Sequence, residues 1–109
     1  MYIILTSKPG QYRSEATDGI TPLGAYDYFY CDRHIATFVL ASIEKDSRVR
    51  IVDESSAPTV NLVPTKFFEK FSTREAALVS IQALAGVTQA DARLVKRNTS
   101  AEHGTTAFD

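Results

Sequence analysis

Four consecutive residues, Cys31-Asp32-Arg33-His34, bring together the most reactive side-chain types of the sequence. A thiolate nucleophile needs a neighbouring base, and a metal ion needs three or four converging ligands. Cys31 and His34 would supply two ligands, and His103 in the C-terminal tail is only a distant third. A small buried cysteine at a strand end, followed by polar turn residues, explains the segment better. We therefore expect no catalytic residue, no metal and no cofactor here.

A stripe of tyrosines is the most suggestive binding feature. Tyr26, Tyr28 and Tyr30 share one face of a predicted strand. Arg48 and Arg50 project from a later strand, and an aromatic and cationic surface of this kind can stack bases or an aromatic ligand. Tyrosine also suits half-buried sheet faces and dimer interfaces, which we favour. The net charge of −1 and the lack of a glycine–aromatic RNA-binding pattern make single-stranded nucleic acid the weakest alternative.

No motif in the sequence specifies a reaction. The glycine-rich dinucleotide motif, the nucleophile elbow and the zinc-protease motif are absent, and Ser7-Lys8-Pro9-Gly10 lacks the spacing of a phosphate-binding loop. The adjacent carboxylates of Asp53 and Glu54 stand at a predicted strand end, where solvated turn charges are expected. These observations favour a binding protein over an enzyme.

Three β-like runs form the centre of the chain, namely Ala25–Cys31, Ile35–Ile43 and Arg48–Asp53. The polar breaks between them, at residues 32–34 and 45–47, have the length of hairpin turns. The second run is apolar on both faces, which is typical of a central strand that is covered on both sides. An antiparallel meander over residues 25–53 is therefore predicted.

Shorter segments complete a predicted sheet of about four strands. Tyr2–Thr6 is expected to dock as a strand beside the meander, and Thr59–Val63 could add a further strand. Pro9 and Gly10 suit the central positions of a type II turn. The polar segment from Gln11 to Leu23 has no sustained period and is predicted to be a loop.

A helix over residues 72–85 is predicted to cover one face of the sheet, with the tyrosines on the other face. Ser72 and Glu75 have the spacing of a capping box, and Gly86 is placed to end the helix. The apolar stripe of this helix consists of Ala77, Leu78, Ile81, Leu84 and Ala85. Short additional helices are predicted within residues 65–71 and 88–96.

The chain of 109 residues fits one α+β domain over residues 1–97, and the polar composition of residues 98–109 predicts a disordered tail. The single cysteine excludes an internal disulfide and favours the cytoplasm. No apolar run reaches the length that spans a bilayer, and the N-terminus lacks the basic start of a secretion signal.

We expect a non-catalytic binding or accessory module that forms a homodimer or docks on a larger protein. Its contact surface would consist of Tyr26, Tyr28, Tyr30, Arg48 and Arg50. The alternative is a small-molecule-binding or enzymatic domain with a pocket between the segment 11–23 and the sheet. The polar groups of that pocket would be Tyr12, Arg13, Tyr28 and His34.

Overall fold

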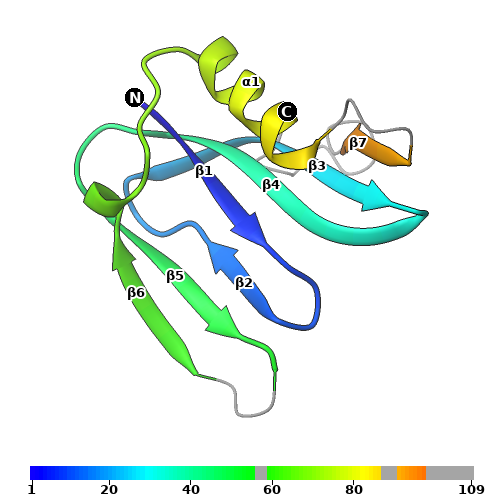
Figure 1. Ribbon diagram of the computed structural model, residues 1–109. Coiled ribbons are helices and arrows are strands. Elements are labelled where there is room, and N and C mark those ends of the chain that lie inside the picture. Colours follow the sequence, from blue (N-terminus) through cyan, green and yellow to red (C-terminus); the bar gives the residue numbers. More distant parts are fainter. Residues whose placement is uncertain (56–58, 87–90, 98–109) are drawn as a thin grey trace.

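The computed structural model describes residues 1–55, 59–86 and 91–97, which form two antiparallel sheets and one α-helix (Figure 1). The first sheet has the strand order β1-β4-β3-β7 and the second the order β2-β5-β6. The strands are β1 (Tyr2–Ser7), β2 (Tyr12–Glu15), β3 (Ile20–Tyr30), β4 (Arg33–Ile43), β5 (Arg48–Asp53), β6 (Val60–Pro64) and β7 (Ala92–Lys96). The helix α1 spans Arg74–Ala85, and a 3₁₀ turn, η1, spans Thr65–Phe67. Within these ranges no helix has the length and apolar character needed to cross a membrane.

The predicted meander is correct for its first two strands and wrong for the third. β3 and β4 form an antiparallel hairpin in which Ala25 lies opposite Val39. β1 pairs with the other edge of β4, with Ile3 opposite Ala41, so β4 is a central strand as expected. Because both edges of β4 are occupied, β5 cannot pair with β4 as a meander requires. It pairs with β2 and β6 instead, and two sheets replace the single predicted one.

The segment predicted as a loop, Gln11–Leu23, contains β2 and the start of β3. β2 is almost entirely polar, so its sequence shows no strand-like alternation, and its pairing with β5 determines its conformation. The turn before it has the predicted form. The Gln11 N–H donates to the Lys8 carbonyl at 2.9 Å, and Gly10 has a φ of 77°, as residue i+2 of a type II turn requires.

The turn between β3 and β4 lies earlier than predicted, at Cys31 and Asp32 instead of residues 32–34. Both residues have positive φ, 52° and 64°, which matches the right-handed twist of a two-residue hairpin. β4 therefore begins at Arg33, and His34 belongs to the strand.

A β-bulge interrupts the same hairpin at Ile35. Tyr28 pairs with Ala36, whereas the next residue, Phe29, pairs with His34, so Ile35 is an extra residue in β4. Because successive strand residues point to opposite faces, one extra residue reverses the orientation of every side chain before it. His34 consequently points to the face opposite the one that a regular strand would give it.

The helix α1 lies across one face of the first sheet (Figure 1). Its N-cap lies one residue later than predicted, at Thr73 and not at Ser72, and the Thr73 hydroxyl accepts a hydrogen bond from the Ala76 N–H at 3.1 Å. It ends as predicted at Gly86, which has a φ of 61°. The cluster under the helix contains Ala36, Phe38, Leu40, Ala77, Ile81 and Ala85.

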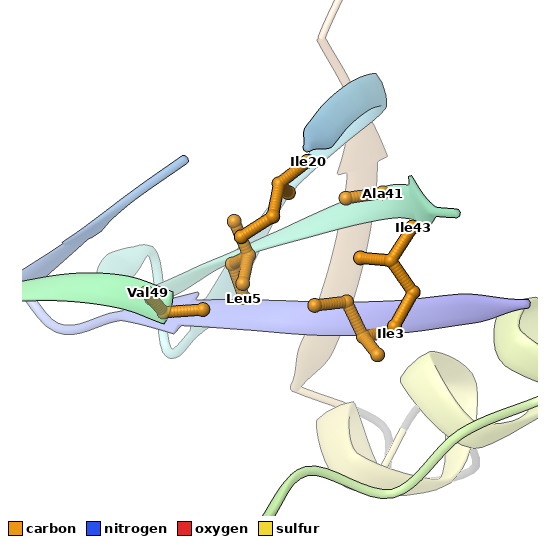
Figure 2. Close-up of a cluster of buried hydrophobic side chains, with 6 residues drawn as sticks. All are labelled: Ile3, Leu5, Ile20, Ala41, Ile43 and Val49. Carbon is orange, nitrogen blue, oxygen red and sulfur yellow. The ribbon is translucent and has the colours of Figure 1, made fainter. Parts of the chain in front are cut away.

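The second sheet packs on the opposite face of the first sheet and encloses a second cluster (Figure 2). This cluster contains Ile3, Leu5, Ile20, Ala41, Ile43 and Val49. β4 supplies residues to both clusters, which confirms that it is covered on both sides. Each fully buried aliphatic side chain contributes roughly 1.5–3 kcal/mol from burial before conformational entropy is counted.

Three expectations for the second half of the chain have different outcomes. The helix predicted within residues 88–96 is wrong for Ala92–Lys96, which form β7 and pair with β3, while residues 87–90 are outside the described part. The strand predicted at Thr59–Val63 is β6, shifted by one residue. Only Thr65–Phe67 is helical within residues 65–71, and as a 3₁₀ turn. The predicted tail, residues 98–109, also lies outside the described residues.

Candidate functional site

The tyrosine stripe lies on the same face of the first sheet as α1, and not on the opposite face as predicted. Tyr26 and Tyr28 are partly buried against the cluster under the helix, and only Tyr30, near the end of the hairpin, is 40% exposed. The helix occupies this side because β3 and β4 present their larger side chains there, with Tyr26 directly opposite Phe38. Tyr26 and Tyr28 therefore pack against the core and leave only part of their surface exposed.

The predicted arginines lie on β5 in the second sheet, away from the tyrosines. Val49 is fully buried between the sheets, so Arg48 and Arg50 on either side of it point outward, as the alternation predicted. The Arg50 Nε lies 3.2 Å from a carboxylate oxygen of Glu15 on β2. The structure thus divides the five predicted contact residues between two sheets.

A hollow of about 340 Å³ lies between the C-terminal end of α1 and the turn that joins β1 to β2. We call it the aromatic groove, and it is lined by Thr6, Lys8, Tyr12, Tyr28, Ile35, Ala36, Phe38 and Leu84. The rings of Tyr28 and Phe38 lie 6.4 Å apart between centroids. Two apolar side chains at the groove, Leu84 and Ile35, are 59% and 36% exposed. The groove is the part of the tyrosine face that α1 does not cover.

A smaller hollow of about 180 Å³ adjoins the aromatic groove between α1 and β1. The two hollows share Thr6 and Leu84. Ile4, Phe68 and Phe71 supply most of the apolar lining of the smaller one. Together they make a depression along the helix side of β1, with Leu84 between them.

A polar cluster, the Asp27 network, occupies the face of the first sheet opposite α1. Thr37 donates a hydrogen bond to Asp27 Oδ1 at 2.8 Å, and Arg97 Nε donates to Oδ2 at 3.2 Å. The Nε2 atom of His34 lies 2.9 Å from Thr37 Oγ1 and 3.2 Å from Asp27 Oδ1. Burial by itself would raise the pKa of Asp27, but hydrogen bonds from Arg97 and Thr37 outweigh it and hold this pKa below its usual value.

An open hollow of about 320 Å³ lies between this face and β2. We call it the intersheet hollow, and it is lined by Ser7, Arg13, Ser14, Thr37, Val39 and Arg97. Arg13 is held by two carboxylates, with Nε 2.7 Å from Glu15 and Nη1 2.5 Å from Glu54. The hydrogen bond with Glu15 is the main reason that the pKa of Arg13 is raised.

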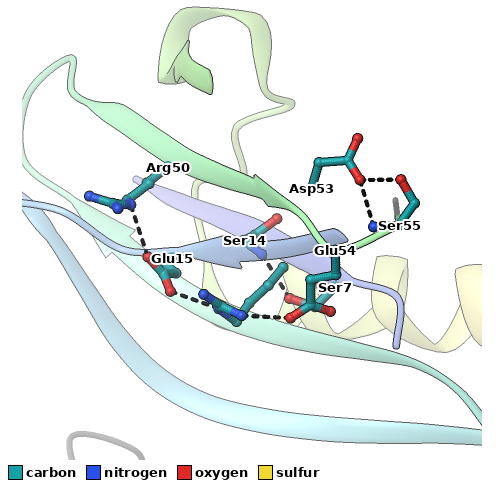
Figure 3. A network of polar contacts seen from close by, with 8 residues as sticks. Ser7, Ser14, Glu15, Arg50, Asp53, Glu54 and Ser55 are labelled. Carbon is teal, nitrogen blue, oxygen red and sulfur yellow. Dashed lines mark hydrogen bonds and ion pairs between the residues drawn. The ribbon is translucent and has the colours of Figure 1, made fainter. Parts of the chain in front are cut away.

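Carboxylates and hydroxyls on β1, on β2 and at the end of β5 have local hydrogen-bond partners (Figure 3). Ser7 Oγ accepts a hydrogen bond from the Ser14 N–H at 2.9 Å, which joins β1 to β2. The backbone N–H and the hydroxyl of Ser55 both donate to Asp53, and these hydrogen bonds lower the pKa of Asp53. Asp53 and Glu54 thus have separate partners and do not act as a carboxylate pair.

The structure does not bring the residues of the predicted alternative pocket together in one hollow. Tyr12 and Tyr28 line the aromatic groove, Arg13 lines the intersheet hollow, and His34 belongs to the Asp27 network. Cys31 is exposed at the hairpin turn, not buried as expected, and the described residues contain no group of three side chains able to hold a metal. Sequence reasoning missed Leu84 as a surface residue, because its spacing fits the apolar stripe of α1.

No protein-family model, curated protein or solved structure matches this chain.

Proposed function

We propose that this chain is a non-catalytic binding module that holds an apolar side chain of a partner protein in the aromatic groove. The observation that carries the proposal is the exposed Leu84 at a groove with an aromatic floor. Soluble domains usually leave apolar side chains exposed singly, and a concave group of them indicates a binding surface. Burying one leucine or phenylalanine of a partner there would contribute roughly 1.5–3 kcal/mol.

The groove also has a polar rim that restricts the partner. Lys8 and Tyr12 line one side of the groove, and Lys8 forms no ion pair within the described residues. An ammonium at the edge of an apolar site favours a carboxylate on the ligand and contributes mainly to specificity. We therefore expect a partner segment with an apolar anchor next to an acidic residue. For the protein itself we predict a cytoplasmic location, because its sequence has a single cysteine and therefore no internal disulfide.

The test is selection of peptides from a random library on the immobilised protein, followed by affinity measurement with purified peptides. We expect the selected peptides to contain an apolar anchor and to bind Leu84→Gln at least tenfold more weakly, a loss of about 1.4 kcal/mol. Val79→Gln is the matched control, because Val79 is equally part of α1 and 64% exposed but does not line the groove. Equal binding to wild type and Leu84→Gln would overturn the proposal.

A second candidate is the binding of a small anion in the intersheet hollow. Arg97 uses Nε and Nη2 on Asp27, and Arg13 uses Nε and Nη1 on carboxylates. Among the described residues, Nη1 of Arg97 and Nη2 of Arg13 donate no hydrogen bond, so each of these two lining residues keeps an unused donor. Ser7 Oγ acts there as an acceptor, so its own proton is also available.

Titration with acetate and inorganic phosphate, followed by amide NMR, separates this candidate from the first. Saturable shifts at Ser14 and Thr37 that disappear in Arg97→Gln would support an anion site. Shifts that grow linearly without saturation would reject it. Neither result depends on Leu84, so the two candidates are tested independently.

A further inference from the structure

The outer edge of β6 is a hydrogen-bonding surface that no described strand covers, because β6 stands at the end of the second sheet (Figure 1). The pairing of β5 with β6 is framed by two hydrogen bonds of 2.8 Å, from the Asp53 N–H to Thr59 O and from the Thr65 N–H to Ser47 O. Backbone groups alternate in direction along an antiparallel strand. The N–H and C=O groups of Val60 and Leu62 therefore point away from β5.

The side chains of this edge are apolar and exposed. Val60 and Leu62 are 49% and 52% exposed, on the outer face of the second sheet. Val60 lies directly opposite Val52, and Leu62 lies directly opposite Arg50. Natural edge strands are normally protected by charged side chains, bulges or proline. In β6 only Pro64 has this role, and it stands at the last position of the strand.

We propose that β6 pairs antiparallel with β6 of a second copy of this chain, across a two-fold axis at Asn61. In this register Val60 lies opposite Leu62 of the partner subunit, and each outward N–H meets an outward carbonyl. The two three-stranded sheets then form one continuous sheet across the dimer.

Three features favour a second copy over an unrelated strand. Antiparallel pairing of identical strands is two-fold symmetric, so one surface serves both subunits. The apolar row made by Val52 and Val60 continues into Leu62 of the partner subunit. The arginines nearest to the junction, Arg48 and Arg50, lie on β5 and not on the paired strands, so no like charges face each other.

Disulfide trapping tests the register directly. In a Cys31→Ser background, Asn61→Cys would place two thiols at directly opposite positions, about 4.5–5.5 Å apart at Cα, which is within disulfide range. We expect a covalent dimer under mild oxidation. The control is Thr59→Cys, because two residues at position 59 would be separated by four strand positions, about 13–14 Å, and cannot be joined. Equal crosslinking of the two variants would overturn the proposed register.

Sedimentation over a concentration series tests the non-covalent dimer. We expect wild-type protein to dimerise and Leu62→Lys to raise the dissociation constant at least tenfold, with an unchanged circular dichroism spectrum. Val79→Lys adds the same charge at an exposed apolar site on α1 and should leave dimerisation unchanged. A wild-type protein that stays monomeric throughout the series, or equal effects of the two lysines, would overturn the proposal. Leu84→Gln should not affect this dimer, so the aromatic groove is judged separately.

Discussion

The Nε2 atom of His34 lies 2.9 Å from Thr37 Oγ1, although Thr37 is three positions after His34 on the same strand. In a regular strand an odd separation places two side chains on opposite faces. The extra residue at Ile35 removes this difference, so His34 and Thr37 share the face that carries Asp27. A single β-bulge therefore brings His34 into the Asp27 network.

The first prediction concerns the acid stability of this network. The pKa of folded Asp27 lies below its unfolded value, so the carboxylate stabilises the fold above the ordinary aspartate pKa of about 4. This stability is lost as the pH falls from about 4 through the lower folded pKa. Asp27→Asn should have a lower free energy of unfolding than the wild type at pH 7. Its free energy of unfolding should also change less with pH below about pH 4.

Urea unfolding at a series of pH values measures this effect. The matched control is Asp53→Asn, because Asp53 also has a lowered pKa but its hydrogen bonds come only from neighbouring Ser55 at an exposed turn. We expect Asp27→Asn to lose more of the free energy of unfolding at pH 7 than Asp53→Asn does. Identical profiles for wild type and Asp27→Asn would show that the network does not stabilise the fold.

The second prediction concerns Gly19, which precedes β3 with a φ of 90°. A Cβ atom at this position would clash with Ser47 Oγ. Gly10 has a similar φ of 77°, but a Cβ there would meet nothing within 4 Å. Gly10→Ala should therefore cost about 1 kcal/mol from backbone strain alone, and Gly19→Ala should cost more.

Thermal and urea unfolding of both variants measure the difference. Ser47→Ala removes the clashing oxygen, so the double variant Gly19→Ala/Ser47→Ala should recover the part of the loss that the clash causes. Equal stabilities of Gly10→Ala and Gly19→Ala would contradict the close approach of Ser47.

The third prediction separates the buried and exposed sides of α1. Ile81 is completely buried on the side of α1 that packs against the first sheet, so Ile81→Ala should destabilise the fold by about 2–5 kcal/mol. Leu84 lies on the same predicted stripe but is largely exposed, and Leu84→Ala should change stability by no more than about 0.5 kcal/mol. A large loss for Leu84→Ala in urea unfolding would mean that Leu84 belongs to the core and not to a binding surface.

The fourth prediction concerns the start of α1. The hydroxyl of Thr73 accepts a hydrogen bond from the Ala76 N–H, so Thr73→Ala should cost about 1 kcal/mol. Ser72 precedes the cap, and Ser72→Ala should have a much smaller effect. Chemical unfolding that ranks the two variants in the opposite order would restore Ser72 as the N-cap.

Local patterns in the sequence determined several elements because their cause is local. Residues 35–43 are apolar on both faces of the strand, which requires cover on both sides. In the structure β4 contributes residues to both hydrophobic clusters. Positive φ at Gly10 and Gly86 follows from the turn and the helix end that these residues form. The outward direction of Arg48 and Arg50 follows from the burial of Val49 between them.

Long-range pairing decided the rest. The polar strand β2 exists because β5 supplies its backbone partners, and β5 leaves the meander because β1 occupies the free edge of β4. The position of α1 over Tyr26 and Tyr28 depends on which face of the first sheet the second sheet covers. None of these choices has a signature within a few residues, because each is a competition between distant segments for the same edge or face.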